Sequence, residues 1–538
     1  MPRRLAIVVA LGLAAAAATA APPPDPFAQA ASGDAKALVA SLAEDYRAGR
    51  LDPWVARLYQ DLRLEAGERA ALLEETRAAY PDPKAPLGGY LLARLAERKD
   101  LEAFLQRCVA TAPDPVAPGL DQAWAALAAE RTPAATAALA RVRKAAGARE
   151  EAVLVEAAIE DAQGRRAVAE RVLAGYVAAH VEAADARAAW AATLHALRRD
   201  ADAVAVLEDG LSRGRSVPLL VARAELALDM GDLPVAGKLA EEAKGRGRPA
   251  SRARSLAVLA ACRLAARDVA GAQTLADEAG KAAPLDELAL RVRARCADAA
   301  GRPADAVRLL DDAIDARPGS VRPYVDKAFL LLRERIVKEA RKVAAEARRR
   351  DPDDVDVQVV LGALEEEDLD WSTAERAYRN VLRLAPDHVL AHRLLAGVSF
   401  QLGRLDQADE AAAWVLARDE KDAPSWFVRG RVAYKRDKFD DALAHFDRAL
   451  AADPTYGLAH CGKGWVYEQQ DRNDDARKAY EAAIAADPRL PLPHRDLGEV
   501  LEILDEPRKA RDAYRKYLEL GGADPDSDVQ RSVERLSK

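Results

Sequence analysis

Small, aromatic and proline residues recur at every 34th position in the C-terminal half of the chain. Ala442 and Ala476 are 34 positions apart, and so are Pro454 and Pro488. Each alanine follows a glycine by twelve positions and precedes an aromatic residue by four. We number the period so that glycine is at position 8, alanine at position 20 and the aromatic residue at position 24. The pattern predicts two closely packed helices joined by a turn, with the proline ending the second helix.

The position-20 alanine marks eleven copies of the period. All steps from Ala272 onward are 34 positions long, whereas the irregular steps of 33 and 36 lie before it. Position 8 is glycine or alanine in every copy. Strand-forming residues never alternate for long, so no sheet is expected. The alanines are Ala169, Ala203, Ala236, Ala272, Ala306, Ala340, Ala374, Ala408, Ala442, Ala476 and Ala510.

This period resembles the tetratricopeptide repeat, a helix–turn–helix unit that stacks on its neighbours. The resemblance implies an all-α fold, an α-solenoid whose stacked repeats form a right-handed superhelix. We assign eleven tandem repeats to residues 149–524 and diverged helical repeats to residues 27–148. We expect residues 525–538 to form a capping helix, because a terminal repeat needs a cover that is apolar inside and polar outside.

The N-terminal stretch, residues 1–20, is predicted to be a signal peptide. Arg3 and Arg4 precede an uncharged apolar run over residues 5–18, and small residues up to Ala20 fit a cleavage site. A proline-rich spacer follows at residues 21–26. The expected location is therefore the periplasm or the exterior, with no membrane span after cleavage. The alternative is an uncleaved N-terminus that anchors the chain in a membrane.

Other candidate chemistry is sparse. Cys262 and Cys296 occupy the same slot of neighbouring repeats, where packed helices are about 8–10 Å apart, too far for a disulfide. His388 and His392 could face one metal ion, but no third ligand is evident, so no metal is expected. No nucleophile, phosphate-loop or dinucleotide motif occurs. The chain has 87 acidic and 80 basic residues. We therefore expect no enzyme activity, no cofactor and no nucleic-acid partner.

The best functional lead is an aromatic and basic cluster on first helices. In the tetratricopeptide family these helices line a concave groove, mainly through positions 2, 5, 9, 12 and 13. Aromatic residues make up only 5% of the chain, yet four fall in these slots of three adjacent repeats, with basic residues among them. Exposed aromatic and arginine side chains are typical of binding hot spots. The alternative is that some of them only fill space between helices. The predicted groove residues are Arg393, Phe400, Phe427, Arg431, Tyr434, Lys435, Trp465 and Arg495.

The resemblance and this cluster predict a non-enzymatic scaffold that binds an extended protein segment in the cell envelope. Mixed charges favour a ligand with apolar anchors and some acidic groups. An alternative is a carbohydrate-handling or assembly component of a polysaccharide secretion system, in which Trp465 and Tyr434 stack on sugars.

The middle repeats are expected to be the weakest part of the array. Three of them carry alanine at position 24, which buries less apolar area than an aromatic residue. The irregular steps and the break Gly245–Pro249 fall in the same region. We therefore predict a hinge near residues 217–285.

Overall fold

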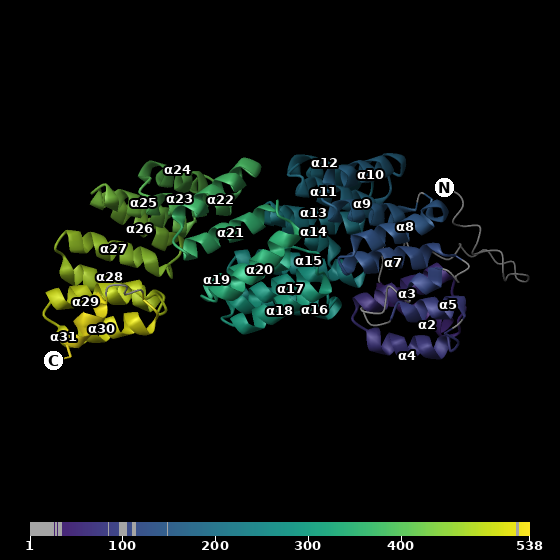
Figure 1. Ribbon diagram of the computed structural model, residues 1–538, viewed down its shortest axis with the longest axis horizontal. Coiled ribbons are helices and arrows are strands. Elements are labelled where there is room, and N and C mark those ends of the chain that lie inside the picture. Colours follow the sequence, from purple (N-terminus) through teal and green to yellow (C-terminus); the bar gives the residue numbers. More distant parts are fainter. Residues whose placement is uncertain are drawn as a thin grey trace, which may run out of the picture. The chain divides into compact units, whose positions relative to one another are not determined.

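The computed structural model describes residues 26, 30, 35–83, 85–95, 105–109, 114–147, 149–522 and 527–537. The predicted signal peptide and the spacer up to Asp25 lie outside the described residues. Throughout the described part, all regular elements are α-helices (Figure 1), which confirms the all-α prediction. The chain forms two compact units that divide after Pro323.

Where the connecting residues are described, short turns join successive helices. In the first unit they are α2 (Ala35–Arg47), α3 (Pro53–Glu65), α4 (Arg69–Ala79), α5 (Pro86–Ala93), α7 (Val116–Ala128), α8 (Thr132–Ala146), α9 (Glu150–Ala162), α10 (Arg166–Ala179), α11 (Ala184–Ala196), α12 (Asp200–Arg213), α13 (Val217–Asp229), α14 (Leu233–Ala243), α15 (Pro249–Ala265), α16 (Val269–Ala282), α17 (Glu287–Ala299) and α18 (Pro303–Ala316). Helix α19 (Arg322–Arg333) contains the division. The second unit contains α20 (Val337–Arg350), α21 (Val355–Glu367), α22 (Trp371–Leu384), α23 (Val389–Gln401), α24 (Leu405–Leu416), α25 (Ala423–Lys435), α26 (Phe439–Ala452), α27 (Gly457–Gln469), α28 (Asn473–Ala486), α29 (Leu492–Ile503), α30 (Pro507–Glu519) and α31 (Asp528–Arg535).

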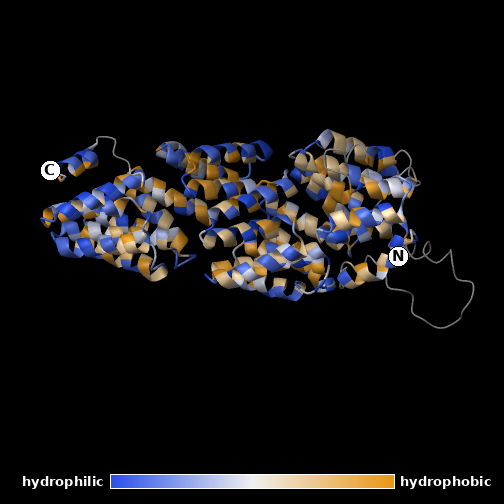
Figure 2. Ribbon diagram, turned by 90° about the horizontal axis from the view of Figure 1, so that it is seen from below, coloured by the Kyte–Doolittle hydropathy of each residue, from blue (hydrophilic) through white to orange (hydrophobic). Residues whose placement is uncertain are grey.

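Each repeat is a pair of helices that packs on the next pair. The two helices of a repeat make the most extensive contacts, as in α15 with α16 and α25 with α26. First helices of successive repeats also contact one another, as α13 contacts α15 and α23 contacts α25. This arrangement is the stacked helical solenoid that the period predicts. Helices carry apolar residues interspersed with hydrophilic ones (Figure 2), as helices with one buried side require. Among the described helices, none is long and apolar enough to cross a lipid bilayer.

The position-20 alanines form the centre of this packing. All eleven have no measurable exposure to solvent. A larger side chain there would separate the two helices of its repeat, so the steric constraint inferred from the sequence holds at each of these sites.

The turn between the two helices of a repeat has one conformation along the array. From Gly164 onward its residue at position 15 has a positive φ, between 57° and 77° among the residues 164, 198, 231, 267, 301, 335, 369, 403, 437, 471 and 505. Four of these are glycine, which adopts this conformation at little cost. The remainder are arginine, aspartate or leucine, so the turn geometry is imposed by the helix packing rather than by glycine.

The first unit also holds a contact between distant repeats. Glu65 at the end of α3 forms an ion pair with Arg248, which directly precedes α15. Its other carboxylate oxygen accepts a hydrogen bond from the backbone N–H of Ala250 at 3.3 Å. Gly67 lies against Pro284, since a β-carbon at Gly67 would be 2.8 Å from the proline ring. The carboxylate at the start of α15 also complements the helix dipole.

This contact lies within the region of the predicted hinge. Residues 217–285 lie inside the first unit, and the boundary between units is farther along, after Pro323. Val217 has no solvent exposure and belongs to a core that continues from α11 to α15. Gly247, with φ of +81°, turns the chain beside Val217 and brings Arg248 toward Glu65. The longer of the two irregular steps therefore places Arg248 in contact with Glu65, and the hinge stays a prediction that hydrogen exchange of residues 217–285 can test.

Candidate functional site

The predicted groove residues lie on four first helices of the second unit. Helix α25 contacts α23 on one side and α27 on the other, and α27 contacts α29. Phe427, Arg431, Tyr434 and Lys435 follow one another along α25 at steps of four, three and one, and the first three therefore share one side of this helix. This side of α25, with its neighbours on α23 and α27, is called the α25 surface below.

The aromatic residues of the α25 surface contact one another. The ring centroid of Phe427 is 6.2 Å from that of Trp465 and 5.7 Å from that of Tyr456. The Tyr434 and Trp465 centroids are 6.4 Å apart. Phe400 and Phe427 are only 9% and 6% exposed, so they fill space between helices, which is the alternative stated for some of the cluster. Tyr434 and Trp465 are half-buried, so part of each side chain remains accessible to solvent.

Arg431 lies among these rings without an anionic partner. Its guanidinium carbon is 3.8 Å from the Phe400 centroid and 5.6 Å from the Phe427 centroid. Both distances are typical of cation–π contacts. Burial lowers the pKa of Arg431 to about 10, while the nearby Tyr456 phenol acts in the opposite direction. Within the described part of the chain, no carboxylate forms an ion pair or hydrogen bond with Arg431.

Two other predicted cations are neutralised by aspartates. Arg393 pairs with Asp422, which also accepts a hydrogen bond from the Ser425 N–H at 3.0 Å and so caps the start of α25. Arg495 pairs with Asp496 at 2.7 Å. The first pair joins α23 to the start of α25, whereas the second lies within α29. Lys435 is exposed at the end of α25.

Acidic residues collect on the opposite side of Trp465, on α27 and α29. Asp496 is 3% exposed and accepts a hydrogen bond of 2.8 Å from the Trp465 indole N–H. Burial, with a contribution from the charges of Asp496 and Glu499, raises the pKa of Glu468 to about 7, although the hydrogen bond from Tyr480 acts in the opposite direction. Burial also raises the pKa of Glu499, and the charge of Asp496 acts in the same direction. The surface thus changes from an unpaired cation on α25 to an excess of carboxylates near α29.

A pairing between positions 12 and 24 explains why aromatic residues collect at this place. Where position 24 is tyrosine, position 12 is a glutamate that accepts a hydrogen bond from the phenol, as in Tyr514 and Glu502 at 2.9 Å. The same pair joins Tyr480 to Glu468 and Tyr378 to Glu366. Two adjacent repeats have no hydroxyl at position 24, where Ala412 and Phe446 stand, and their position-12 residues are Phe400 and Tyr434.

The residue types at positions 12 and 24 of a repeat thus depend on one another. This dependence can be read from the sequence, but the groove positions carried over from the family do not include position 24. It distinguishes position-12 glutamates that accept a hydrogen bond from the tyrosine of their own repeat from the position-12 aromatic residues Phe400 and Tyr434, which lack this partner. Sequence reasoning also missed Tyr456 and the two partner aspartates, Asp422 and Asp496. These three lie outside the groove slots carried over from the family, so slot matching alone could not find them.

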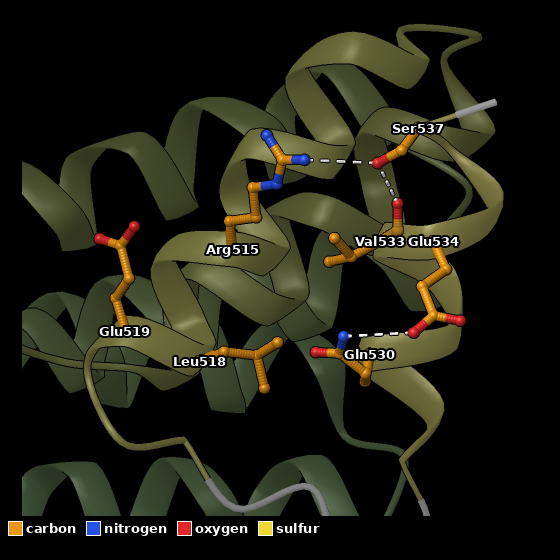
Figure 3. A pocket seen from close by; sticks show the side chains of 7 residues that line it. All are labelled: Arg515, Leu518, Glu519, Gln530, Val533, Glu534 and Ser537. Atoms are coloured by element: carbon orange, nitrogen blue, oxygen red, sulfur yellow. Dashed lines mark hydrogen bonds between the residues drawn. The ribbon is translucent and has the colours of Figure 1, made fainter.

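A hollow in the second unit lies elsewhere, between α30 and α31 (Figure 3). It is shallow and open. Ser537 Oγ accepts a hydrogen bond of 3.4 Å from Arg515 and donates one of 2.6 Å to the Val533 carbonyl, while Gln530 donates to Glu534 at 3.3 Å. Val533 is the buried residue of α31 and joins the core of the last repeats with Val529 and Leu536. The hollow therefore lies where the terminal helix α31 packs on α30.

The described residues contain no group of three or more potential metal ligands.

Comparisons with known proteins agree with the repeat architecture. A tetratricopeptide repeat family model matches residues 263–321, 367–423 and 400–457, and a second one matches residues 299–364 and 433–526. No curated protein matches the chain.

Solved structures with a similar fold include a chain of the APC/C hetero-tetramer Cut9–Hcn1. It has 14% identity and a TM-score of 0.53, over 92% of this chain and 98% of that one. A tetratricopeptide repeat protein from Parabacteroides merdae has 15% identity and a TM-score of 0.37, over 47% and 99% of the two chains. MamA has 25% identity and a TM-score of 0.25, over 30% and 94%. The repeat period, the buried alanines, the helical pairs and the family matches together identify the chain as a tetratricopeptide repeat protein.

Proposed function

We propose that the chain is a non-enzymatic scaffold in the cell envelope that binds an extended protein segment on the α25 surface. Proteins of this repeat family generally act as scaffolds for protein–protein interaction. The observation that carries the proposal here is the half-buried pair Tyr434 and Trp465 beside the unpaired Arg431. Tyrosine, tryptophan and arginine are the residues most enriched at binding hot spots.

The packing of the surface supports an extended rather than a folded ligand. Phe400 and Phe427 fill the space between α23, α25 and α27, and Tyr434 and Trp465 stand above them. A segment that crosses successive first helices would meet a new set of side chains at each repeat. Its apolar side chains would bury Tyr434 and Trp465, and burial of apolar area contributes about 25 cal/mol per Å².

Selection of a random peptide library on the immobilised protein tests this assignment. Tyr434→Ala removes a half-buried ring from the edge of the core around Phe427 and Phe446 and is expected to abolish enrichment of the peptides that wild type selects. Tyr467→Ala is the matched control, because Tyr467 is also half-buried near the end of a first helix but lies under Arg472. Equal enrichment on both variants would refute the α25 surface as the binding site.

Two further measurements address the rest of the proposal. Cleavage after Ala20 predicts Ala21 as the mature N-terminus, and mass spectrometry of the envelope fraction can identify it; intact Met1 would favour a membrane anchor. A glycan array tests the carbohydrate alternative, which the exposed Tyr434 and Trp465 rings also suit. Sugar binding that is lost in Trp465→Ala would favour that alternative.

A further inference from the structure

We propose that Arg431 forms a carboxylate-binding subsite, so that the α25 surface selects segments in which an acidic side chain stands next to an apolar or aromatic one. This inference rests on the proposed function and adds the chemistry of the ligand. It concerns one guanidinium and the rings around it, on α23, α25 and α27.

The pairing of neighbouring arginines makes Arg431 the exception. On the same helix, Arg429 pairs with Asp409 at 2.7 Å. Arg436, directly after α25, pairs with Asp406. Arg393 on α23 and Arg495 on α29 each have an aspartate of their own. Only Arg431, within this set, has rings instead of a carboxylate as its partners.

The geometry leaves the donors of Arg431 available. A guanidinium that lies over an aromatic ring still presents its N–H groups along the edge, in a planar fork that matches a carboxylate. A shielded cation without a counterion loses part of its hydration, and its lowered pKa of about 10 reflects this loss. A ligand carboxylate would restore the missing interaction through charge-assisted hydrogen bonds.

The number of free guanidinium forks favours a single carboxylate over a phosphate group. A phosphate carries close to two charges at neutral pH and is best held by several donors. Arg393 is held by Asp422, which also caps α25. Lys435, one helical turn after Arg431, is exposed, but its ammonium is a point charge and adds no second fork. One free guanidinium fork therefore suits one carboxylate.

The surroundings also restrict where that carboxylate can lie. Near α29, the carboxylates of Glu468, Asp496 and Glu499 outnumber the one cation, Arg495, so an acidic ligand residue there would be repelled. Between the two ends lie Phe427, Tyr434 and Trp465. A fitting segment has its acidic residue toward α25, an apolar residue beside it, and a neutral or basic residue toward α29.

Synthetic peptides taken from the library selection test the inference directly. Each peptide is acetylated and amidated, so that its only carboxylate is the side chain in question, and its affinity is measured by fluorescence anisotropy. Changing that Asp or Glu to the amide is expected to weaken binding to wild type by about tenfold or more, the effect of losing a charge-assisted pair. This measurement uses only the wild-type protein, so misfolding of a variant cannot affect its result.

The protein variants complete a thermodynamic cycle. Arg431→Met is expected to bind the acidic and the amide peptide equally, both about as weakly as wild type binds the amide. Arg431→Lys keeps the charge and should recover part of the difference. Arg429→Met is the matched control on the same helix, where the arginine already has Asp409, and should retain the full preference for the acidic peptide.

The outcomes separate the two proposals. If Tyr434-dependent peptides bind wild type with no preference for acid over amide, the carboxylate subsite is refuted while the binding surface stands. Tighter binding of a peptide whose only carboxylate is its C-terminus, or of a phosphoserine peptide, would also refute the subsite as proposed. If wild type selects no peptides, the proposed function fails together with the inference.

Discussion

The ring of Phe446 on α26 packs so closely on Gly430 of α25 that a β-carbon at residue 430 would overlap it. The same relationship joins Gly464 to Tyr480, Gly498 to Tyr514 and Gly362 to Tyr378. In the other repeats position 8 is alanine, and position 24 is then alanine or leucine. Glycine at position 8 therefore makes room for the aromatic ring at position 24 of the same repeat.

Gly430→Ala is therefore expected to destabilise α25 and α26. The added methyl group overpacks the Phe446 site, which typically costs about 1–3 kcal/mol. Hydrogen exchange of the α26 amides measures this local stability, which is suited to an array whose repeats open separately.

Two further variants test the cause. Gly397→Ala, in the helix interior of α23, has no atom within 4 Å of the new methyl group and should stabilise by about 0.5–1 kcal/mol. The double variant Gly430→Ala with Phe446→Leu reproduces the other kind of repeat. It should lose less stability than the sum of its single changes, and simple additivity would contradict the packing explanation.

Glu468 predicts a pH dependence of stability. Its pKa is about 7 in the folded chain because burial disfavours the carboxylate, against 4.5 for a free glutamate. The folded state therefore holds a proton that the unfolded state has released between about pH 4.5 and 7, and stability falls as pH rises through this window. Glu468→Gln keeps an oxygen that accepts from Tyr480 and should flatten this part of the stability curve. An unchanged slope in the variant would exclude Glu468 as its source.

The contact between Glu65 and Arg248 predicts coupled protection of two distant helices. Glu65→Gln or Arg248→Ala should speed hydrogen exchange both in α3 and in the first turn of α15, by about the equivalent of 1 kcal/mol for a partly buried pair that also caps a helix. Arg246→Ala is the matched control, because Arg246 is exposed and shortly precedes Arg248. Faster exchange in α15 with no change in α3 would show that the two helices are not coupled.

The cysteines should differ in reactivity. Burial raises the pKa of the Cys296 thiol to about 11 and also raises that of Cys461, and both side chains have no solvent exposure. Cys262 is half-buried, and burial raises its pKa as well. Iodoacetamide at about pH 8 should therefore modify Cys262 first and the other two only as the helices open. Mass spectrometry after timed quenching measures the order, and early labelling of Cys296 would contradict it.

The fold was predictable from the sequence because its strongest constraints are local and steric. The alanine of position 20 and the small residue of position 8 are where helices touch, and these sites tolerate few side chains. Such constraints recur once in every repeat and are visible without any structure. The contact of Arg248 with Glu65 was not predictable for the opposite reason, because it joins positions far apart in the chain and leaves no trace in the spacing.

The candidate site was predictable only in outline. The groove positions of the tetratricopeptide family predicted that Tyr434, Trp465 and Arg431 lie on adjoining first helices, and the structure has them there. They could not show that Phe400 and Phe427 are covered by their neighbours. Nor could they show that Arg393 and Arg495 are each held by an aspartate, because ion pairing depends on which side chains the helix packing brings together.

The closure of α3 on α15 sets how the two units can change in evolution. Several repeats lie between the partners of this contact, and each repeat advances the array by about 8–10 Å. Gain or loss of one repeat inside this span would carry Arg248 out of reach of Glu65. Duplications are therefore expected to be lost between α3 and Pro284 and to survive after it, so that this span keeps a fixed copy number of repeats while the later part of the array can vary in length.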